Sequence, residues 1–318
     1  MDSRTLTPRA LIAVGGHALI PAHPQVTVAD QRANARRTAR HIVSLLQRGY
    51  EVVVTHGNGP QVGAALIRSE QAAGAAYMHP LDVCVAATQG EIGYLLQQTL
   101  GDELRAAALA TPVATVVTQV VVAPDDPSLE HPTKPVGPFY TSAEADKHQA
   151  QDGWVMMEDV ARGHRRVVPS PRPTEVVEEP TIRALVESGV LVIALGGGGI
   201  PVVREGDTTR GIQAVVDKDH SSALLAANLG ASHYLNVTNV DRVYLDYPSH
   251  TREGLGRITA SELTRHLEAS HFPAGTMGPK VESVLAFLDH GGSHAVITST
   301  EQLAHGLDPE VGTHVRPG

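Results

Sequence analysis

Four lysines stand out in this sequence because arginine occupies almost every other basic position. The 318 residues include 25 Lys and Arg together, of which only residues 134, 147, 218 and 280 are lysine. Lys134, Lys218 and Lys280 lie among Gly, Pro and Asp, whereas Lys147 lies in a polar, helix-like stretch. Lysine carries a compact charge on a flexible stem, which suits the holding of a phosphoryl group. We therefore predict a function for those three lysines, with codon bias as the alternative explanation for their rarity.

Four glycine-rich turns follow or bridge apolar segments, at 14–18, 55–61, 195–201 and 274–280. Glycine lets backbone N–H groups converge on an anion, and a helix that follows adds partial positive charge. Ligands of open α/β sheets sit beyond the carboxyl ends of the strands, so these turns are expected to meet around one ligand. A single glycine turn is ordinary punctuation, and only the set indicates an anion site. No turn matches a P-loop or a dinucleotide-binding fingerprint.

Two polar segments could complete such a site. Residues 217–219, Asp-Lys-Asp, begin a predicted helix, where acidic residues are ordinary capping residues. A lysine between two aspartates also suits a second task, in which one carboxylate orients the lysine and the ammonium faces a phosphate. Residues 238–244 follow a predicted strand and offer hydroxyl, amide and carboxylate groups. They suit a nucleotide pocket, although they would also make a plain turn.

The elements that must position these groups follow from apolar runs that alternate with longer helical patterns. Strands are predicted at 10–14, 51–55, 113–122, 190–195, 233–238 and 295–298. Helices are predicted at 28–47, 60–73, 86–100, 180–187, 218–229, 259–268 and 280–290. Gly49, Gly101, Gly189 and Gly230 are expected just past helix ends. Several strands are continuously apolar, as in parallel sheets covered on both faces, so we predict a doubly wound α/β sheet.

The segment from 123 to 173 breaks this rhythm with many prolines, a lone Trp154 and a basic cluster. We predict that about 123–170 leaves the main sheet as a small lid or subdomain. The cluster comprises Arg162, Arg165 and Arg166. These arginines could close over phosphates, or they could form salt bridges with Glu158, Asp159 or Glu175. The proline-rich surroundings favour the salt bridges, because they resemble a fixed crossover.

Composition excludes several classes of function. The chain is 42% hydrophobic with a net charge of −9 and no basic run, so duplex nucleic acid is not expected as its main partner. No apolar stretch reaches the roughly 18 residues that indicate a membrane span. The single cysteine, Cys84, cannot form an internal disulfide, which fits a reducing cytoplasm, and its apolar neighbours predict a packed thiol. No His or Cys spacing indicates a metal site.

Taken together, the motifs resemble those of the carbamate kinases of the amino acid kinase family. The resemblance covers nearly the whole chain. Its strings include Gly-Gly-x-Ala-Leu at 15–19, His-Gly-Asn-Gly-Pro-Gln-Val-Gly at 56–63, Pro-Thr-Lys-Pro at 132–135, Arg-Arg-Val-Val-Pro-Ser-Pro at 165–171 and Met-Gly-Pro-Lys at 277–280. The strings at 56–63 and 165–171 are long and specific.

The resemblance implies a fold, a reaction and partners. The fold would be an open αβα three-layer sandwich with a mostly parallel central sheet. It would form a single domain over 1–318, with the protruding lid at about 123–170. The reaction would be ATP + carbamate ⇌ ADP + carbamoyl phosphate, with Mg²⁺ and ATP or ADP. The protein would be a cytoplasmic homodimer without nucleic-acid or membrane partners.

The resemblance also assigns residues to three roles. The catalytic residues would be Lys134, Lys218 and Lys280. The carbamate and the transferring phosphoryl group would be bounded by Gly15, Gly16, His17, Gly57, Asn58 and Gly59. The nucleotide would be bordered by Gly196, Gly197, Asp219, Asn239, Asp241, Tyr244 and Met277. No residue is assigned to a metal, and Asn34 and Arg37 receive no role beyond a helix surface.

One position departs from the family pattern, because His17 stands where the family usually has asparagine. Histidine offers both a hydrogen-bond donor and an acceptor only when neutral, and it titrates near neutral pH. His17 could do the same work with a pH dependence, or it could reshape the pocket for a different small carboxylate. It could also mark a paralogue that binds nucleotide or carbamoyl phosphate as a regulator without turnover.

Overall fold

The computed structural model describes residues 7–16, 26–159, 162–247, 252–273 and 275–318, and within them eight strands form a central sheet. These strands are β1 (Arg9–Val14), β2 (Glu51–His56), β3 (Val113–Thr115), β9 (Leu191–Ala194), β12 (His233–Thr238), β15 (Arg257–Thr259), β16 (His294–Ser299) and β17 (Thr313–Arg316). Their order is β15-β17-β16-β12-β1-β2-β9-β3. Only β16 and β17 pair in antiparallel fashion, and every other neighbouring pair is parallel.

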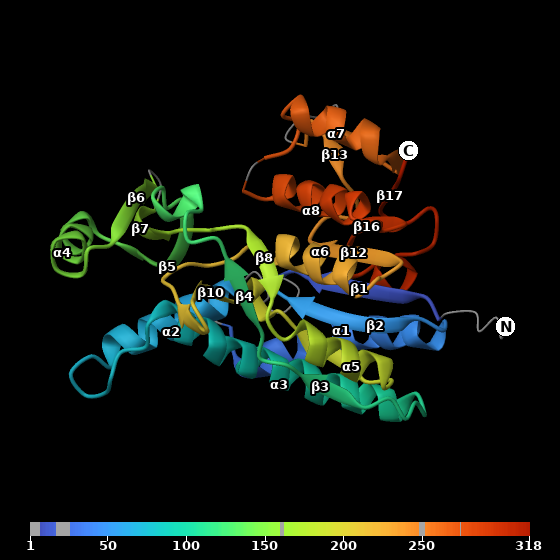
Figure 1. Ribbon diagram of the computed structural model, residues 1–318, viewed down its shortest axis with the longest axis horizontal. Coiled ribbons are helices and arrows are strands. Elements are labelled where there is room, and N and C mark those ends of the chain that lie inside the picture. The colour runs from blue at the N-terminus through green and yellow to red at the C-terminus, as the bar shows by residue number, and fades with distance from the viewer. Residues whose placement is uncertain (1–6, 17–25, 160–161, 248–251, 274) are drawn as a thin grey trace.

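Helices cover both faces of this sheet (Figure 1). One face packs against α1 (Val28–Gln47) and α3 (Leu81–Ala106), and the other packs against α5 (Glu179–Glu187), α6 (Lys218–Asn228) and α8 (Met277–Asp289). The remaining helices are α2 (Gly59–Gln71), α4 (Ser142–Asp152) and α7 (Ala260–Glu268). This arrangement confirms the predicted αβα sandwich with a mostly parallel sheet.

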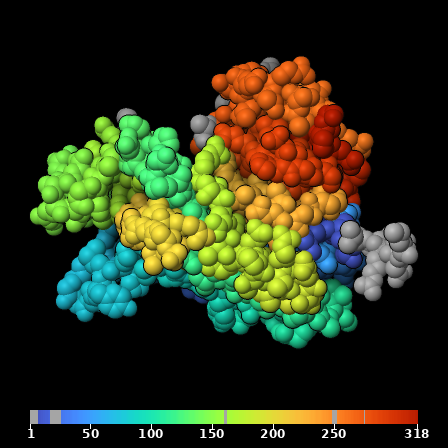
Figure 2. Space-filling model, in the orientation of Figure 1, coloured from blue at the N-terminus to red at the C-terminus, as the bar shows by residue number. Residues whose placement is uncertain are grey.

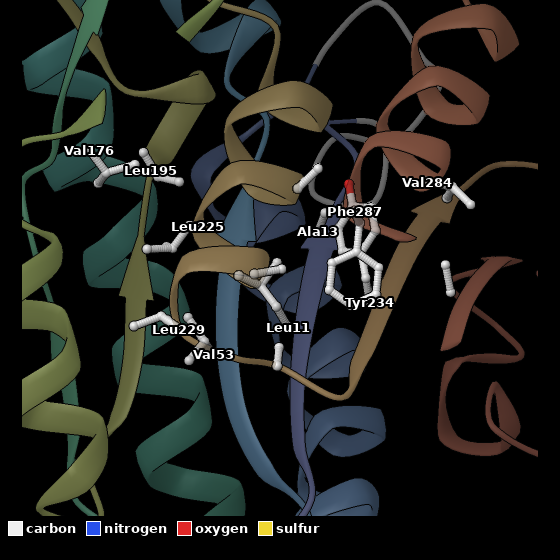
Figure 3. Close-up of a cluster of buried hydrophobic side chains, with 14 of the residues drawn as sticks. Leu11, Ala13, Val53, Val176, Leu195, Leu225, Leu229, Tyr234, Val284 and Phe287 are labelled. Atoms are coloured by element: carbon white, nitrogen blue, oxygen red, sulfur yellow. The ribbon is translucent and has the colours of Figure 1, made fainter. Parts of the chain in front are cut away.

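The alternation of side chains along β1 explains the three layers. Ala10, Ile12 and Val14 face the layer of α1 and α3, whereas Leu11 and Ala13 face the layer of α6 and α8. Figure 3 shows the second layer, in which Leu11, Leu225 and Phe287 come from β1, α6 and α8. Because both faces of the strand are buried, its sequence is continuously apolar.

Most helices begin and end where the sequence predicts, at capping residues and at glycines. A capping box between Thr27 and Asp30 starts α1. Gly49, Gly189 and Gly230 have φ values of +87°, +80° and +64° just after helices, as predicted. The prediction for Gly101 is wrong, because α3 continues to Ala106. Leu100 and Leu104, one turn apart, keep burying the same face of that helix, so the glycine does not end it.

The single strand predicted over 113–122 is also wrong. Residues 113–115 form β3 of the central sheet, whereas β4 (Gln119–Val122) belongs to a second sheet with β8 (Pro173–Val176), β10 (Ile200–Glu205) and β11 (Thr208–Gly211). Thr118 causes the break: its N–H donates to Gln89 Oε1 at 2.8 Å and its hydroxyl donates to Val116 O at 2.7 Å. These contacts turn the chain out of the main sheet, and an apolar run does not reveal them.

A third sheet projects from the body of the molecule, on the left in Figure 1. It consists of β5 (Lys134–Tyr140), β7 (Gly163–Val168) and β6 (Val155–Asp159), with α4 beside it. Trp154 stacks on His148 with ring centroids 4.3 Å apart, and the guanidinium of Arg166 lies 4.3 Å from the Trp154 ring centroid. The predicted pair of Arg162 with Asp159 is present at 2.7 Å. That 123–170 acts as a lid stays a prediction.

Two further features bear on the expectations from composition. Cys84 is buried in α3, as predicted for a packed thiol, and burial raises its pKa. Among the helices of the described ranges, not one combines the length and the apolar character needed to cross a membrane.

Candidate active site

A cavity of about 710 Å³ opens at the carboxyl ends of the central strands. Its walls include residues that directly follow β1, β2, β12 and β16, together with Lys134 of β5 and the first turns of α6 and α8. Figure 2 shows an indented surface between the green projection and the orange and red lobe, which both contribute to these walls. Loops after separate parallel strands thus meet in one place.

The turns after β1 and β2 touch each other through glycine. Gly57 N donates to Val14 O at 2.9 Å, and a Cβ on Gly57 would lie only 2.8 Å from Gly16 N and 3.6 Å from Cδ of Lys218. Any side chain at position 57 would therefore displace this corner, where backbone N–H groups can approach an anion. The cavity is lined here by Gly15, Gly16, Gly57, Asn58 and Gly59. His17 lies outside the described residues.

Two lysines share one buried carboxylate at the start of α6. Lys218 Nζ bonds to Oδ1 of Asp219, and Lys280 Nζ lies 3.0 Å from Oδ2 of the same residue. Burial alone would raise the pKa of Asp219, but the charges of Lys218 and Lys280 outweigh it and hold that pKa well below its usual value. Burial, opposed by Asp219, lowers the pKa of Lys218. Two ammonium groups against one carboxylate leave this cluster positive.

A layer of polar side chains beneath fixes Asp219 in place. Asn236 Nδ2 donates to Asp219 Oδ1 at 2.9 Å, and the hydroxyl of Tyr234 donates to the backbone oxygen of Asp219 at 3.2 Å. Both residues belong to β12 and are fully buried. The central sheet therefore positions the carboxylate that orients the two lysines.

Lys134 reaches the same place from the projecting sheet. Its Nζ lies 2.8 Å from Oδ2 of Asp217, the N-cap residue of α6. The three lysines predicted to be functional thus come from β5, α6 and α8 and all line one cavity. Lys147 is exposed on α4 and does not line the cavity, as predicted for an ordinary surface residue.

The candidate nucleotide residues divide between the cavity wall and its surroundings. Gly197, Asp219, Asn239, Tyr244 and Met277 line the cavity. Asp241 is not among the described lining residues, and its Oδ1 accepts a 2.8 Å hydrogen bond from the hydroxyl of Tyr244. Asp241 therefore orients a lining residue without lining the cavity itself.

Gly196 also lies behind the wall and does not line the described cavity. A Cβ at this position would lie 2.8 Å from both the His56 ring and the Gln89 side chain. Gln89 Nε2 donates to Gly196 O at 2.9 Å. Burial lowers the pKa of His56 to about 4, so this ring is uncharged at neutral pH. Gly196 allows close packing below the cavity.

Several lining residues were not predicted from the sequence. Asn34 and Arg37 of α1 line the cavity, and so do Thr300 and Glu301 after β16. Arg37 donates to Asn34 Oδ1 at 2.6 Å. Both lie in the first half of α1, at the end of the sheet where the ligand loops gather, and that position is the only signal that could have indicated them.

Charge on the cavity wall differs in sign from that of the whole chain. The described lining residues include five basic side chains and three carboxylates, although the chain carries a formal charge of −9. Arg165 is one of the five, and its Nε donates to Gly137 O at 3.1 Å. In the described ranges, no group of three or more His, Cys, Asp or Glu side chains is arranged to hold a metal ion. The described wall of the cavity therefore carries a net positive charge, which suits an anionic ligand.

A parallel αβα sandwich with lysines and glycine loops at its strand ends is typical of proteins that bind phosphorylated ligands. The sequence profile of the amino acid kinase family matches residues 8–299. The chain is 43% identical to the carbamate kinase of Pyrococcus horikoshii, over 97% of this chain and 99% of that protein. It is 45% identical to carbamate kinase 2 of Enterococcus faecalis, over 95% and 97% of the two chains.

The comparison with solved structures gives the same family. Carbamate kinase from Giardia lamblia bound to AMP-PNP superposes with a TM-score of 0.94 at 39% identity, covering 99% of this chain and 100% of that one. N-acetylglutamate synthase from Neisseria gonorrhoeae, at 13% identity and a TM-score of 0.60, shares the fold alone, over 98% of this chain and 62% of that one. The protein described here therefore belongs to the amino acid kinase family, and within it to the carbamate kinases.

Proposed function

We propose that this protein catalyses the reversible reaction ATP + carbamate ⇌ ADP + carbamoyl phosphate. The observation that carries the proposal is the convergence of Lys134, Lys218 and Lys280 with the glycine turns on one cavity. The full-length similarity to carbamate kinases supports the same activity. The sequence resemblance to that family leads to the same proposal.

The chemistry fits the groups in the cavity. A carbamate oxygen is already anionic, so no general base has to create the nucleophile. The reaction needs two anions held in line and the charge on the transferring phosphoryl group neutralised. In our proposal Lys218 and Lys280, both paired with Asp219, contact the phosphoryl oxygens, and Lys134 approaches from the projection. The backbone N–H groups near Gly16 and Gly57 bind the acceptor side.

The proposal extends to the nucleotide and to a metal ion. In our proposal Asn239, Tyr244 and Met277 border the nucleotide, and the similarity to a carbamate kinase bound to AMP-PNP supports this role for the cavity. Asp217 and Asp219 are each paired with lysine. This pairing fits a Mg²⁺ ion held mainly through the nucleotide's phosphates, where it would neutralise further phosphate charge.

The domain organisation, the oligomeric state and the cellular location belong to the proposal as well. The chain would form a single domain over 1–318 in which 123–170 acts as a lid, and the contact of Lys134 with Asp217 supports a lid that reaches the cavity. The protein would act as a homodimer in the cytoplasm, as the resemblance to its family implies.

A direct assay tests the proposed activity. Purified protein is mixed with ADP, Mg²⁺ and carbamoyl phosphate, and ATP is measured with luciferase. We expect ATP to form in proportion to the enzyme added. A folded protein that binds ADP but forms no ATP would contradict the proposal and favour a different carboxylate acceptor or a regulatory role, the alternatives raised by His17.

A further inference from the structure

Asn58 occupies the N-cap position of α2, but its side chain does not cap the helix. Asparagine is among the preferred N-cap residues because its side-chain oxygen accepts from the first free N–H groups of a helix. Here the amide is instead directed to α3, where Asn58 Nδ2 donates to Thr88 Oγ1 at 2.9 Å. Asn58 lines the cavity and is almost fully buried.

Thr88 dictates which way this amide faces. Its hydroxyl has one proton, and Oγ1 lies 2.8 Å from Val85 O, a carbonyl oxygen that can only accept. In this geometry Thr88 Oγ1 donates to Val85 O and accepts from Asn58 Nδ2. The reversed amide would place Oδ1 against Oγ1, and two acceptors would then compete for one proton. Thr88 is fully buried, so water cannot supply another donor.

Gly197 leaves room for the amide in this position. It has a φ of +68°, and a Cβ on this residue would overlap the Asn58 amide, lying 2.2 Å from Cγ. The amide is thus held between α3 and the backbone of the third glycine turn. Its Nδ2 is used by Thr88, and no hydrogen-bond partner for its Oδ1 is found among the described residues.

The free oxygen matters because of where it lies. The cavity wall next to Asn58 includes Gly16, Gly57 and Lys218, and it offers the donors of a glycine turn and an ammonium group. Donors recognise carboxylate and phosphoryl oxygens, but they cannot recognise an amino group. Carbamate and carbamoyl phosphate carry an NH₂ group, which needs an acceptor.

We infer that Thr88 is a specificity-determining positioning residue that holds the Asn58 carbonyl oxygen ready to accept from the NH₂ group of carbamate. The inference rests on the proposed function and deepens it. Acetate has the same shape, with a methyl group in place of NH₂, and leaves this oxygen without a partner. A site built around such a hydrogen bond discriminates against the analogue that lacks the donor.

The test compares carbamoyl phosphate with acetyl phosphate as phosphoryl donors to ADP, which yield carbamate or acetate together with ATP. The value of kcat/KM is measured for each donor with the wild type, Thr88→Val and Thr88→Ser. Valine keeps the shape of threonine but removes the hydroxyl oxygen that accepts from Asn58. Serine keeps that oxygen. We expect Thr88→Val to lower the ratio of the two kcat/KM values by about tenfold, mainly through slower use of carbamoyl phosphate. Thr88→Ser should keep the wild-type ratio.

Thr99 provides a matched control in the same helix. It is fully buried, and its hydroxyl donates only to helix carbonyls, at 2.8 Å from Leu95 O and 3.1 Å from Leu96 O. Thr99→Val should leave the donor ratio unchanged. If Thr88→Val does not fold, Thr88→Ala gives the same comparison.

Each other outcome has a distinct meaning. An equal fall for both donors, or no change for either, would overturn the inference, because a purely structural role leaves the ratio constant. Equal use of both donors by the wild type would overturn it as well, while the proposed activity stands. No ATP from carbamoyl phosphate with the wild type would remove the proposed function, and the inference with it.

Discussion

Lys134 of the projecting sheet is paired with Asp217 at the N-cap of α6, with Nζ 2.8 Å from Oδ2. The other carboxylate oxygen of Asp217, Oδ1, accepts a hydrogen bond from Asp219 N at 2.9 Å. One side chain therefore caps the helix that presents Lys218 and also holds Lys134 over the cavity. A partly exposed ion pair contributes little to stability, so we expect its main effect on the position of Lys134.

Asp217→Asn separates these two tasks. Asparagine keeps an oxygen that can cap α6 but lacks the charge that holds Lys134. We expect the KM for carbamoyl phosphate to rise about tenfold, while the melting temperature stays near the wild-type value. Asp217→Ala should show the same kinetic defect and also lose about 1 kcal/mol of folding free energy with the cap. Equal melting temperatures for the Asn and Ala variants, or wild-type kinetics for Asp217→Asn, would contradict this division.

Gly197→Ala should damage the site through the Asn58 amide. The added Cβ would lie 2.2 Å from Asn58 Cγ, so the amide must move. We expect kcat/KM to fall by about 10²-fold. Gly206 is the matched control, because it also has a positive φ, +62°, but a Cβ there meets nothing within 4 Å. Gly206→Ala should lower stability slightly and leave kcat/KM unchanged, and equal kinetic losses for the two variants would argue against the steric explanation.

Acid should destabilise the fold through a histidine pair far from the cavity. His294 Nε2 lies 2.8 Å from His314 Nδ1. Burial, with the charges of His314 and His233, lowers the pKa of His294 from 6.5 to about 3. Below pH 6.5 this histidine takes up a proton in the unfolded chain but not in the folded one. The contribution of His294 to the free energy of unfolding is therefore complete above pH 6.5 and is lost as the pH falls towards 3.

Thermal melting between pH 7 and pH 5 tests this account. We expect the melting temperature of the wild type to fall with pH and that of His294→Gln to fall less steeply. His305→Gln is the surface control, because the His305 side chain is 72% exposed, and it should follow the wild type. Parallel pH profiles for wild type and His294→Gln would contradict the assignment.

Much of the architecture could be predicted because the sequence patterns that indicate strands and helix starts arise directly from burial and helix capping. Continuously apolar runs mark strands buried on both faces, and the Asp-Lys-Asp sequence marks the start of α6. The convergence of the lysine-bearing turns follows from the rule that parallel strands deliver their loops to one edge. The sharing of Asp219 by Lys218 and Lys280 goes beyond the predicted orientation of one lysine by one aspartate.

Predictions failed where tertiary contacts override local pattern. Gly101 does not end α3, because Leu104 continues the buried face. Thr118 breaks an apolar run through a hydrogen bond from its N–H to the distant side chain of Gln89. Asn34 and Arg37 acquire a place in the cavity wall only when α1 packs beside the strand ends. Gly196 lies in a predicted motif but faces His56 and Gln89 rather than the cavity.

The most direct test of the central claim, that lysines of this cavity drive phosphoryl transfer, compares Lys218→Ala with Lys147→Ala. ATP formation from ADP, Mg²⁺ and carbamoyl phosphate is measured for both, with circular dichroism to establish folding. We predict that Lys218→Ala folds but loses activity by about 10²-fold or more, whereas Lys147→Ala, on an exposed surface of α4, matches the wild type. Near-normal turnover in a folded Lys218→Ala variant would contradict the account.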